Sequence, residues 1–447
     1  MFGLLESGFQ QFYWGNALML VIAGILIYLG VAKKMEPLLL IPIGFGILLV
    51  NLPLGGLMDY RLEVRALQAS NVIEVRIQEG ERFREGDIIC QLDSGEVLAP
   101  VYGRVEEIKV SPGQHIEAGG VVASIITTAQ TDQSRLPTEP LGLLSRIFKF
   151  GIMWQVIPPL IFLCLGALTD FGPMLANPKM LFLGAAAQFG VYFAFIMALL
   201  CGFTIAEACS IGIIGGAEGP TTIYVTSILA PHIIGATAVA CYSYMALVPI
   251  IQPPIIRLLT SKKERAIYMK PQLREVSKLE KTLFPIISSI VIILLVPFSA
   301  PLIGMFMLGN LFRECGVTER LSNTAQTAMI DILTILLTLS IGASMPSENF
   351  LLPKTLLVLI LGVVAFATAT AAGVILAKIM NLFSKEKINP MVGAAGVSAV
   401  PMAARVVQIM GQKENPRNFL LMHSMGPNVA GAIGAAIAGG VFLGMVR

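Results

Sequence analysis

An acidic residue lies inside an apolar, interrupted stretch in the first half of the chain. Residues 209–224 read Cys-Ser-Ile-Gly-Ile-Ile-Gly-Gly-Ala-Glu-Gly-Pro-Thr-Thr-Ile-Tyr, so that Glu218 stands among glycines and precedes Pro220. An ionised carboxylate at the centre of a bilayer span costs about 2.5–3.5 kcal/mol, and such residues commonly mark ion pathways. We therefore favour a functional role for Glu218 over the alternative of a solvated residue near the aqueous end of a helix.

A second interrupted stretch occurs late in the chain. Residues 389–405 read Asn-Pro-Met-Val-Gly-Ala-Ala-Gly-Val-Ser-Ala-Val-Pro-Met-Ala-Ala-Arg, with Asn389, Ser398 and Arg405 as the polar side chains. Two Gly/Pro-interrupted apolar segments, one in each half, are the best sequence indication of a transporter's ion site. Freed backbone carbonyls can coordinate a cation there, and a carboxylate can supply the countercharge. The two stretches together predict a cation site that contains Glu218.

Other polar groups within apolar stretches are weaker candidates. Asp331 could supply a second carboxylate, and Asn428, at a third Gly/Pro break, could join a cation site or cap a helix. A tyrosine within a span is usually a packed, hydrogen-bonded core residue. We interpret the remaining groups as structural or interfacial; they are Glu207, Tyr242, Tyr244, His232 and His423.

The elements that must position these groups are membrane spans. Apolar residues make up 55% and charged residues 13% of the 447 residues, against about 45–50% and about 25% in soluble domains. This composition predicts a polytopic, all-α membrane protein, and it excludes a cytosolic enzyme, a nucleic-acid binder and a secreted disulfide scaffold. The predicted spans are 16–33, 37–55, 152–169, 179–203, 231–256, 283–311, 325–344, 353–380 and 418–445, and the interrupted segments are 205–229 and 389–411.

Residues 59–135 differ from the rest of the chain. They hold almost half of the 28 acidic residues and show the alternation of polar and apolar residues that is typical of strands. We predict a small all-β domain here, inserted between an N-terminal transmembrane hairpin (1–58) and a transmembrane cation-pumping core (136–447).

The predicted β domain contains an internal repeat. Residues 72–89 align with residues 105–122, which pairs Gly80 with Gly113. The two halves resemble those of a biotinyl/lipoyl carrier domain, a barrel-sandwich fold that carries its cofactor on a lysine at the hairpin between the halves. The corresponding stretch, 91–100, has no lysine, and Lys109 is predicted to lie within a strand. We therefore expect no covalently bound biotin on this chain, and a docking or purely structural role for the domain.

The placement of basic residues leaves two topologies open. The loop 257–281 is the most basic in the chain and is predicted to be cytoplasmic. If the segment 205–229 turns back within the membrane, Lys33 and Lys34 are also cytoplasmic and the β domain lies outside. If the segment crosses, the β domain is cytoplasmic, which Arg146 and Lys149 favour.

Six runs of sequence, in this order, closely resemble the beta subunit of sodium-pumping biotin-dependent decarboxylases, which act on oxaloacetate, methylmalonyl-CoA, glutaconyl-CoA or malonate. We expect the resemblance to leave out residues 59–145. We expect an all-helical membrane domain with about eleven hydrophobic segments, some of them broken or re-entrant, in two inverted, pseudo-symmetric halves. The expected location is the cytoplasmic membrane of a bacterium or archaeon. The runs are 32–46, 167–179, 215–221, 242–254, 393–405 and 422–431.

The resemblance implies a mechanism and a set of partners. A carboxyltransferase alpha subunit would move carboxylate from an organic acid or thioester to biotin on a carrier protein or domain. This chain would then decarboxylate carboxybiotin, consume a proton and export Na⁺. A small membrane gamma or delta subunit, further copies of the chain and membrane lipid are the other implied partners.

The resemblance also assigns residues. The implied cation ligands are Glu218, Asn389, Asn428 and Ser398. Tyr244 would lie on the proton path, and Ser398 is implied at the catalytic site as well. Arg405 and Gly393 would bind carboxybiotin, with Arg405 holding its carboxyl group.

The chain departs from the family pattern at two residues and at the β domain. The family usually has Asp where this chain has Glu218, which is one methylene longer and has an ordinary pKa of about 4.3 against about 3.9. The coupling ion could therefore be Na⁺ or H⁺. Asp331 stands where Asn is expected, and the β domain is expected to replace a connection of different character.

Two other hypotheses explain parts of this pattern. A secondary transporter for a cation or a carboxylate, without decarboxylase chemistry, would also contain paired interrupted segments. Tyr244, Arg405 and the order of the motifs favour the decarboxylase subunit, and turnover of carboxybiotin would discriminate between the two. A scaffold that has lost pumping is a third hypothesis, suggested by Glu218.

Overall fold

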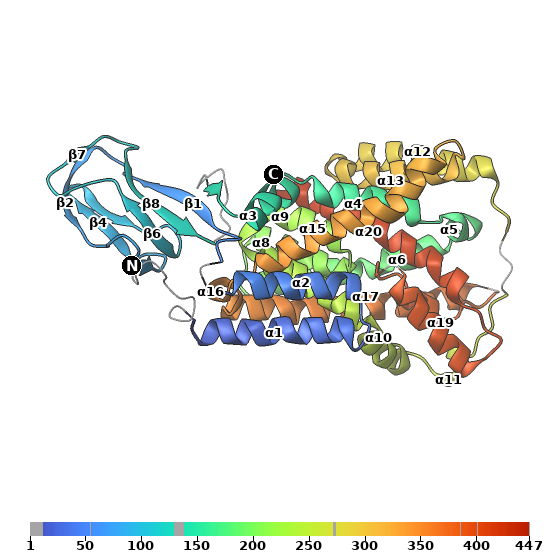
Figure 1. The fold of residues 1–447 in the computed structure, drawn as a ribbon. Helices are drawn as coiled ribbons and strands as arrows, with labels where there is room; N and C mark the ends of the chain where they lie inside the picture. Colours follow the sequence, from blue (N-terminus) through green and yellow to red (C-terminus); the bar gives the residue numbers. More distant parts are fainter. Residues whose placement is uncertain are drawn as a thin grey trace.

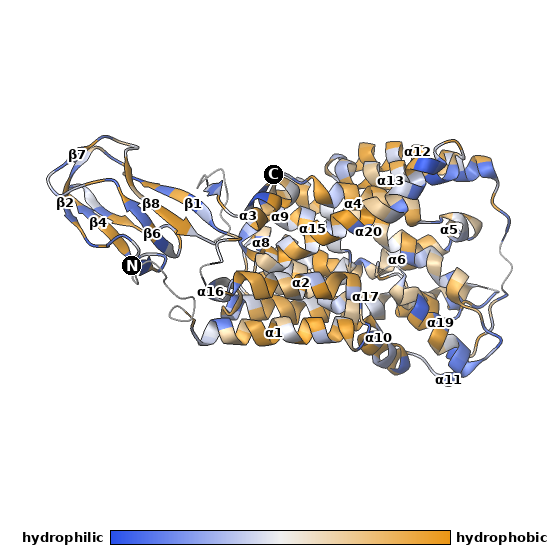
Figure 2. Cartoon of the chain, viewed as in Figure 1, coloured by the Kyte–Doolittle hydropathy of each residue, from blue (hydrophilic) through white to orange (hydrophobic). Residues whose placement is uncertain are grey.

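Apolar helices form most of the molecule. The computed structural model describes residues 12–53, 55–128, 138–270, 274–384, 386–399 and 401–446. Within these ranges six helices are long and apolar enough to cross a membrane, or seven if one bent helix pair is counted as a span. Figure 1 shows the helices as one bundle with a small β domain at one end, and in Figure 2 the apolar colours follow the bundle. The predicted polytopic all-α membrane domain is confirmed.

The first two helices show which parts of the chain lie at each end of the bundle. The helices α1 (Trp14–Val31) and α2 (Pro37–Val50) form a hairpin. At its open end the Tyr13 hydroxyl lies 2.6 Å from the Ser347 Oγ, and the Asn51 amide donates to the Met345 carbonyl at 2.9 Å. The β domain follows α2, so we call this the β-domain end. An 18-residue helix spans about 27 Å, which places the loop after α1 at the opposite end of the bundle.

The helix α10 (Ile234–Leu259) links the same two ends. It begins at the β-domain end, because Gly235 packs directly against the Ser344 carbonyl. It ends at the basic loop 257–281, which therefore lies at the opposite end together with Lys33 and Lys34. We call this the basic end.

The first interrupted segment turns back within the bundle. It consists of α8 (Ile205–Gly212), η3 (Ile213–Gly216) and α9 (Gly219–Leu229). Its two ends meet at the β-domain end, where the His232 Nε2 lies 3.0 Å from the Glu207 Oε1. The segment 205–229 therefore does not cross the membrane.

The second interrupted segment opens toward the basic end. It contains α18 (Met391–Ala394) and α19 (Met402–Glu414). Both of its ends contact the basic loop, since the Asn389 amide donates to the Arg265 carbonyl at 2.7 Å and the Asn418 amide donates to the Ile267 carbonyl at 2.7 Å. The two interrupted segments thus enter the bundle from opposite ends. The division into two inverted halves stays a prediction, which this arrangement supports.

One predicted span is wrong. Residues 283–311 form a helical hairpin, α12 (Lys278–Leu295) and α13 (Ala300–Glu314), rather than one span. The open ends of the hairpin meet where the Thr282 hydroxyl donates to the Glu314 carbonyl at 3.4 Å. Pro297 lies at the reversal and lacks the N–H that would continue the helix.

The other predicted spans correspond to helices of the bundle. Short or bent elements connect them, and the sharpest bend, 66°, separates residues 143–153 from α4. The bounds are α3 (Leu143–Ile147), η2 (Phe148–Met153), α4 (Ile157–Leu168), α5 (Gly172–Ala176), α6 (Met180–Ala187), α7 (Phe189–Leu200), η4 (Pro231–Ile233), α11 (Lys262–Arg265), η5 (Pro297–Ser299), α14 (Glu319–Thr324), η6 (Ala325–Met329), α15 (Ile330–Ala343), α16 (Ser347–Phe350), α17 (Pro353–Phe383) and α20 (Leu421–Val446).

The β domain consists of two sheets around a shared apolar core. One sheet has the strand order β3-β6-β8-β1-β9 and the other β5-β4-β2-β7. The small all-β domain is thereby confirmed, whereas its likeness to a biotinyl/lipoyl domain stays a prediction. The strands are β1 (Tyr60–Arg65), β2 (Ser70–Val75), β3 (Arg82–Phe83), β4 (Ile88–Leu92), β5 (Gly95–Leu98), β6 (Gly103–Ile108), β7 (His115–Ile116), β8 (Val121–Thr127) and β9 (Thr138–Pro140).

The internal repeat of the β domain is visible in its hydrogen bonds. Gly80 donates its N–H to the Val105 carbonyl at 2.9 Å, and Gly113 donates to the Val72 carbonyl at 2.8 Å. Both glycines have a positive φ, +83° and +85°, a conformation that favours glycine. Lys109 follows β6 directly rather than lying within it.

Candidate functional site

The tips of the two interrupted segments touch each other inside the bundle. Glu218 precedes α9 and is 4% exposed, and Ser398 follows α18 and is 1% exposed. The Ser398 hydroxyl donates to the Glu218 carboxylate, and the Ser398 N–H donates to the Gly216 carbonyl at 3.2 Å. The glycines and prolines of the two interrupted segments end their helices at this point. Here one backbone hydrogen bond and one side-chain hydrogen bond join the two segments. The structure thus brings Glu218 and Ser398 together, while their roles as cation ligands, and the catalytic role of Ser398, stay predictions.

The Glu218 carboxylate has no positively charged partner among the described residues. Within the part of the chain that the structure describes, no Lys, Arg or His forms an ion pair with Glu218. A buried ionised carboxylate is costly unless it is paired or coordinates a cation. The site can thus hold a cation or a proton.

The carboxylate opens onto a cavity of about 240 Å³. Glu218 and Ser398 line it together with the Tyr242 ring and the hydroxyl-bearing residues Thr169 and Thr338. Most of the other lining residues are apolar. They are Leu38, Leu39, Ile161, Leu165, Pro220, Met245, Phe306, Ile330, Leu337, Ala399, Met402, Val429 and Ala432, and the remaining polar ones are Glu36 and Thr334.

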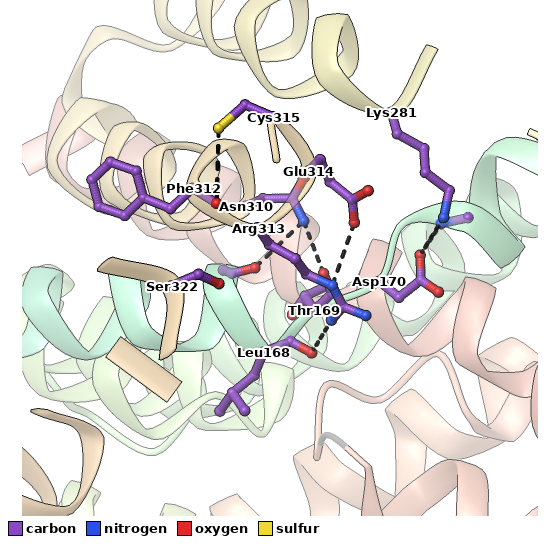
Figure 3. A network of polar contacts seen from close by, with 12 residues as sticks. Leu168, Thr169, Asp170, Lys281, Asn310, Phe312, Arg313, Glu314, Cys315 and Ser322 are labelled. Carbon is purple, nitrogen blue, oxygen red and sulfur yellow. Dashed lines mark hydrogen bonds and ion pairs between the residues drawn. The ribbon is translucent and has the colours of Figure 1, made fainter. Parts of the chain in front are cut away.

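A network of polar contacts holds the residues that follow α4, among them the cavity-lining Thr169, in place (Figure 3). The Asn310 amide donates to the Thr169 carbonyl at 2.8 Å, and Arg313 donates to the Leu168 carbonyl at 2.8 Å. The next residue, Asp170, lies 3.5 Å from the Lys281 Nζ. The end of α4 is thereby held against α13 and α12, which keeps Thr169 at the cavity.

Asn428 supports the segment that carries Ser398. Its amide nitrogen donates to the Ala395 and Val397 carbonyls at 3.0 and 2.8 Å. Its side-chain oxygen is buried and accepts no hydrogen bond among the described residues. A neutral side-chain oxygen is therefore available on the residue that binds the backbone just before Ser398. The role of Asn428 as a cation ligand stays a prediction.

Asn389 and Gly393 lie outside the lining of the cavity. Asn389 is fully buried at the basic end, where its amide donates to the Arg265 and Ile267 carbonyls at 2.7 and 2.9 Å. A Cβ on Gly393 would overlap the Gly373 carbonyl, so this glycine allows α18 to pack against α17. The structure gives both residues a structural position, and their roles as ligands stay predictions.

The two tyrosines of α10 point to different places. Tyr242 lines the cavity and packs against Gly219. The Tyr244 hydroxyl donates to the Leu359 carbonyl, and its ring packs against Gly362 on α17. The residue pattern favours a structural role for both tyrosines, and the family resemblance implies a proton path at Tyr244. Of the two, Tyr242 is the one that lines the cavity beside the carboxylate.

Two charged residues of the sequence analysis take unexpected positions. Asp331 is exposed and does not line the cavity, although its neighbour Ile330 does. Arg405 is exposed on α19 and is absent from the lining, but its charge acts on Glu36. Glu36 was not identified as a site residue, although it lies within the run 32–46, because a glutamate in a short loop beside two lysines has the pattern of a solvated turn.

The fold and the site together define an integral membrane protein that buries an uncompensated carboxylate between two interrupted hairpins. Residues 15–446 match the family of the Na⁺-transporting oxaloacetate decarboxylase beta subunit. The chain belongs to this family, which makes it a multi-pass membrane subunit of a Na⁺-translocating decarboxylase. This membership favours the decarboxylase subunit over a secondary transporter.

Individual relatives are similar over almost their whole length. The chain is 50% identical to the methylmalonyl-CoA decarboxylase subunit beta of Propionigenium modestum, over 98% of this chain and 97% of that protein. It is 49% identical to the oxaloacetate decarboxylase beta chain 2 of Salmonella typhi, over 98% and 97%. The methylmalonyl-CoA decarboxylase subunit beta of Veillonella parvula is 46% identical, over 99% and 96%.

These alignments correct one expectation. They extend over nearly the whole chain, and the family match is a single range. Residues 59–145 are therefore part of what the relatives share. The predictions that the resemblance leaves out this region, and that the β domain replaces a different connection, are wrong.

Proposed function

We propose that this chain decarboxylates carboxybiotin presented by a partner's carrier and couples the reaction to export of Na⁺ through Glu218. The observation that carries the proposal is the buried Glu218 carboxylate. It has no positive partner in the part of the chain that the structure describes, and it lies where the two interrupted segments meet. The relatives are named for decarboxylation of oxaloacetate or methylmalonyl-CoA, and this chain is proposed to serve a reaction of that class.

The chemistry requires one proton for each carbon dioxide released. The bond between the biotin nitrogen and the carboxylate carbon breaks, the electron pair stays on nitrogen, and a proton then neutralises the nitrogen. Glu218 would take up a proton from solvent as it releases its cation and then pass that proton to the biotin nitrogen, so that cation release and proton uptake occur at one carboxylate. Ser398 and the free oxygen of Asn428 would supply neutral ligands. Three further roles rest on the family resemblance: binding of the carboxyl group by Arg405, a proton path at Tyr244 and a place beside carboxybiotin for Gly393.

The proposed partners are a carboxyltransferase alpha subunit, a biotin carrier, a small gamma or delta subunit and further copies of this chain. The negative charge of the Glu218 carboxylate fits Na⁺ coupling, while its side chain, longer than that of Asp, leaves H⁺ as the second candidate ion. The membrane is proposed to be the cytoplasmic membrane.

Substitution of Glu218 tests the proposal in the assembled complex. We expect Glu218→Gln to abolish both Na⁺-stimulated decarboxylation and Na⁺ uptake into inverted vesicles, because the amide carries no charge. Glu218→Asp should retain both activities. Glu319→Gln, on the exposed face of α14, is the matched control and should behave as the wild type. Retained Na⁺-stimulated turnover in Glu218→Gln would overturn the assignment.

A further inference from the structure

The loop between α1 and α2 has a strained backbone. Lys34 and Glu36 have φ values of +53° and +36°, which are left-handed although neither residue is glycine. Such residues cost free energy and persist where the surrounding structure determines them, often at functional sites. The Glu36 carbonyl accepts the N–H groups of Leu39 and Leu40, each at 3.0 Å. Its carboxylate makes no helix-capping bond.

Glu36 lines the same cavity as Glu218. Among the described lining residues these are the two carboxylates, and none is basic. Glu36 stands at the basic end of the bundle, beside the loop that joins α1 to α2, whereas Glu218 stands at the tip contact in the interior. The cavity thus carries negative charge at two depths, with the hydroxyl-bearing residues Thr169, Thr334 and Thr338 among its walls.

Arg405, which is exposed on α19 and does not line the cavity, is the charged group that acts on Glu36. Burial raises the pKa of Glu36, and the Arg405 charge opposes this rise. No ion pair joins the two residues in the described part of the chain, so the Arg405 charge acts on the Glu36 carboxylate without being paired with it. An anion bound by Arg405 would weaken this attraction and leave Glu36 more attractive to a cation.

We propose that Glu36 is a second cation-binding carboxylate, which takes up a monovalent cation at the basic end of the cavity and delivers it toward Glu218. This inference rests on the proposed function, in which Glu218 binds the transported cation. Two carboxylates at different depths would let a cation lose its water in steps, because each step replaces hydration with a charged oxygen ligand.

The test compares cation saturation in variants of the full chain. Na⁺ dependence is measured by turnover of the assembled complex and by thermal stabilisation of the purified chain, with K⁺ holding the ionic strength constant. A ligand that binds only the folded state stabilises it in proportion to its saturation. We expect Glu36→Gln to raise the half-saturating Na⁺ concentration by about tenfold while maximal turnover is retained. Glu36→Asp, which withdraws the carboxylate by one methylene, should give a smaller rise.

The matched control is Glu319→Gln, which removes a negative charge from an exposed glutamate outside the cavity. It should leave the half-saturating concentration unchanged. An unchanged half-saturating Na⁺ concentration in Glu36→Gln would overturn the proposal. A loss of maximal turnover at an unchanged half-saturating concentration would also overturn it, because Glu36 would then act in the decarboxylation and not in cation binding. If Glu36→Gln does not fold, an unchanged value in Glu36→Asp overturns it. If the wild type itself shows no Na⁺ dependence, the proposed function fails instead.

Discussion

At the scale of single residues, the contact between Ser398 and Glu218 decides how the cation site is held. Ser398 gives the carboxylate its side-chain hydrogen bond, and a bond to a charged group contributes about 1.5–3 kcal/mol. We expect Ser398→Ala to lower the thermal stability of the chain by about this amount and to raise the half-saturating Na⁺ concentration at least tenfold, about 1.4 kcal/mol. Thermal unfolding across a Na⁺ series measures both effects.

The control for Ser398→Ala is Ser340→Ala. The Ser340 hydroxyl is buried in α15 and has no hydrogen-bond partner among the described residues. Its removal should be neutral or slightly stabilising, because no bond is lost. Equal effects of the two substitutions would show that the Ser398 contact does not support the site.

The sequence predicted part of this site because the breaks themselves are local. Glycines and prolines end helices wherever they stand, so the two tips and their polar residues could be identified. The sequence could not show which of these polar residues lie close to Glu218. Asn389 and Ser398 belong to the same interrupted segment, yet Ser398 contacts Glu218 in the interior and Asn389 lies at the basic end of the bundle. Glu36 was missed because its role depends on the turn that directs it, and neighbouring lysines give that turn a solvated pattern.

At the scale of elements, close helix contacts hold the interrupted segments in place. Gly393 on α18 faces Gly373 on α17, and a Cβ at either position would overlap the other's carbonyl. We expect Gly393→Ala to destabilise the chain by about 1–3 kcal/mol, as overpacking does. The measurement is thermal unfolding of the purified chain. Gly24→Ala on α1 is the control, because its Cβ would meet no neighbour, and it should leave stability unchanged or raised.

Element boundaries were predictable where apolar length alone decides them, as for α10, α17 and α20. They were not predictable at residues 283–311, because an apolar run of that length fits one long span as well as two short helices. The reversal at Pro297 becomes evident only when Thr282 and Glu314 are seen to meet. Similarly, the turn of 205–229 depends on the contact between Glu207 and His232, which are far apart in the sequence.

At the scale of the whole molecule, the two ends of the bundle differ in charge and in attached structure. The basic loop, Lys33 and Lys34 share one end, and the β domain lies at the other. The positive-inside rule therefore predicts a cytoplasmic basic end and a β domain on the outside. Lys149 does not oppose this, because its Nζ donates to the Thr138 carbonyl at 2.7 Å and is thereby tied to the β domain. The sequence left both topologies open because it did not show that 205–229 turns back.

Cysteine accessibility tests this orientation. In a background that replaces the two cysteines that are not buried, Cys201 and Cys315, one cysteine is introduced at Leu67, which is 95% exposed on the β domain, or at Lys263, exposed on α11. In right-side-out vesicles a membrane-impermeant maleimide should label Leu67→Cys directly and Lys263→Cys only after lysis. The reverse pattern would place the β domain in the cytoplasm and Glu36 at the outer face. Uptake of the exported cation at Glu36 requires the first pattern, because the cation must reach this carboxylate from the cytoplasm.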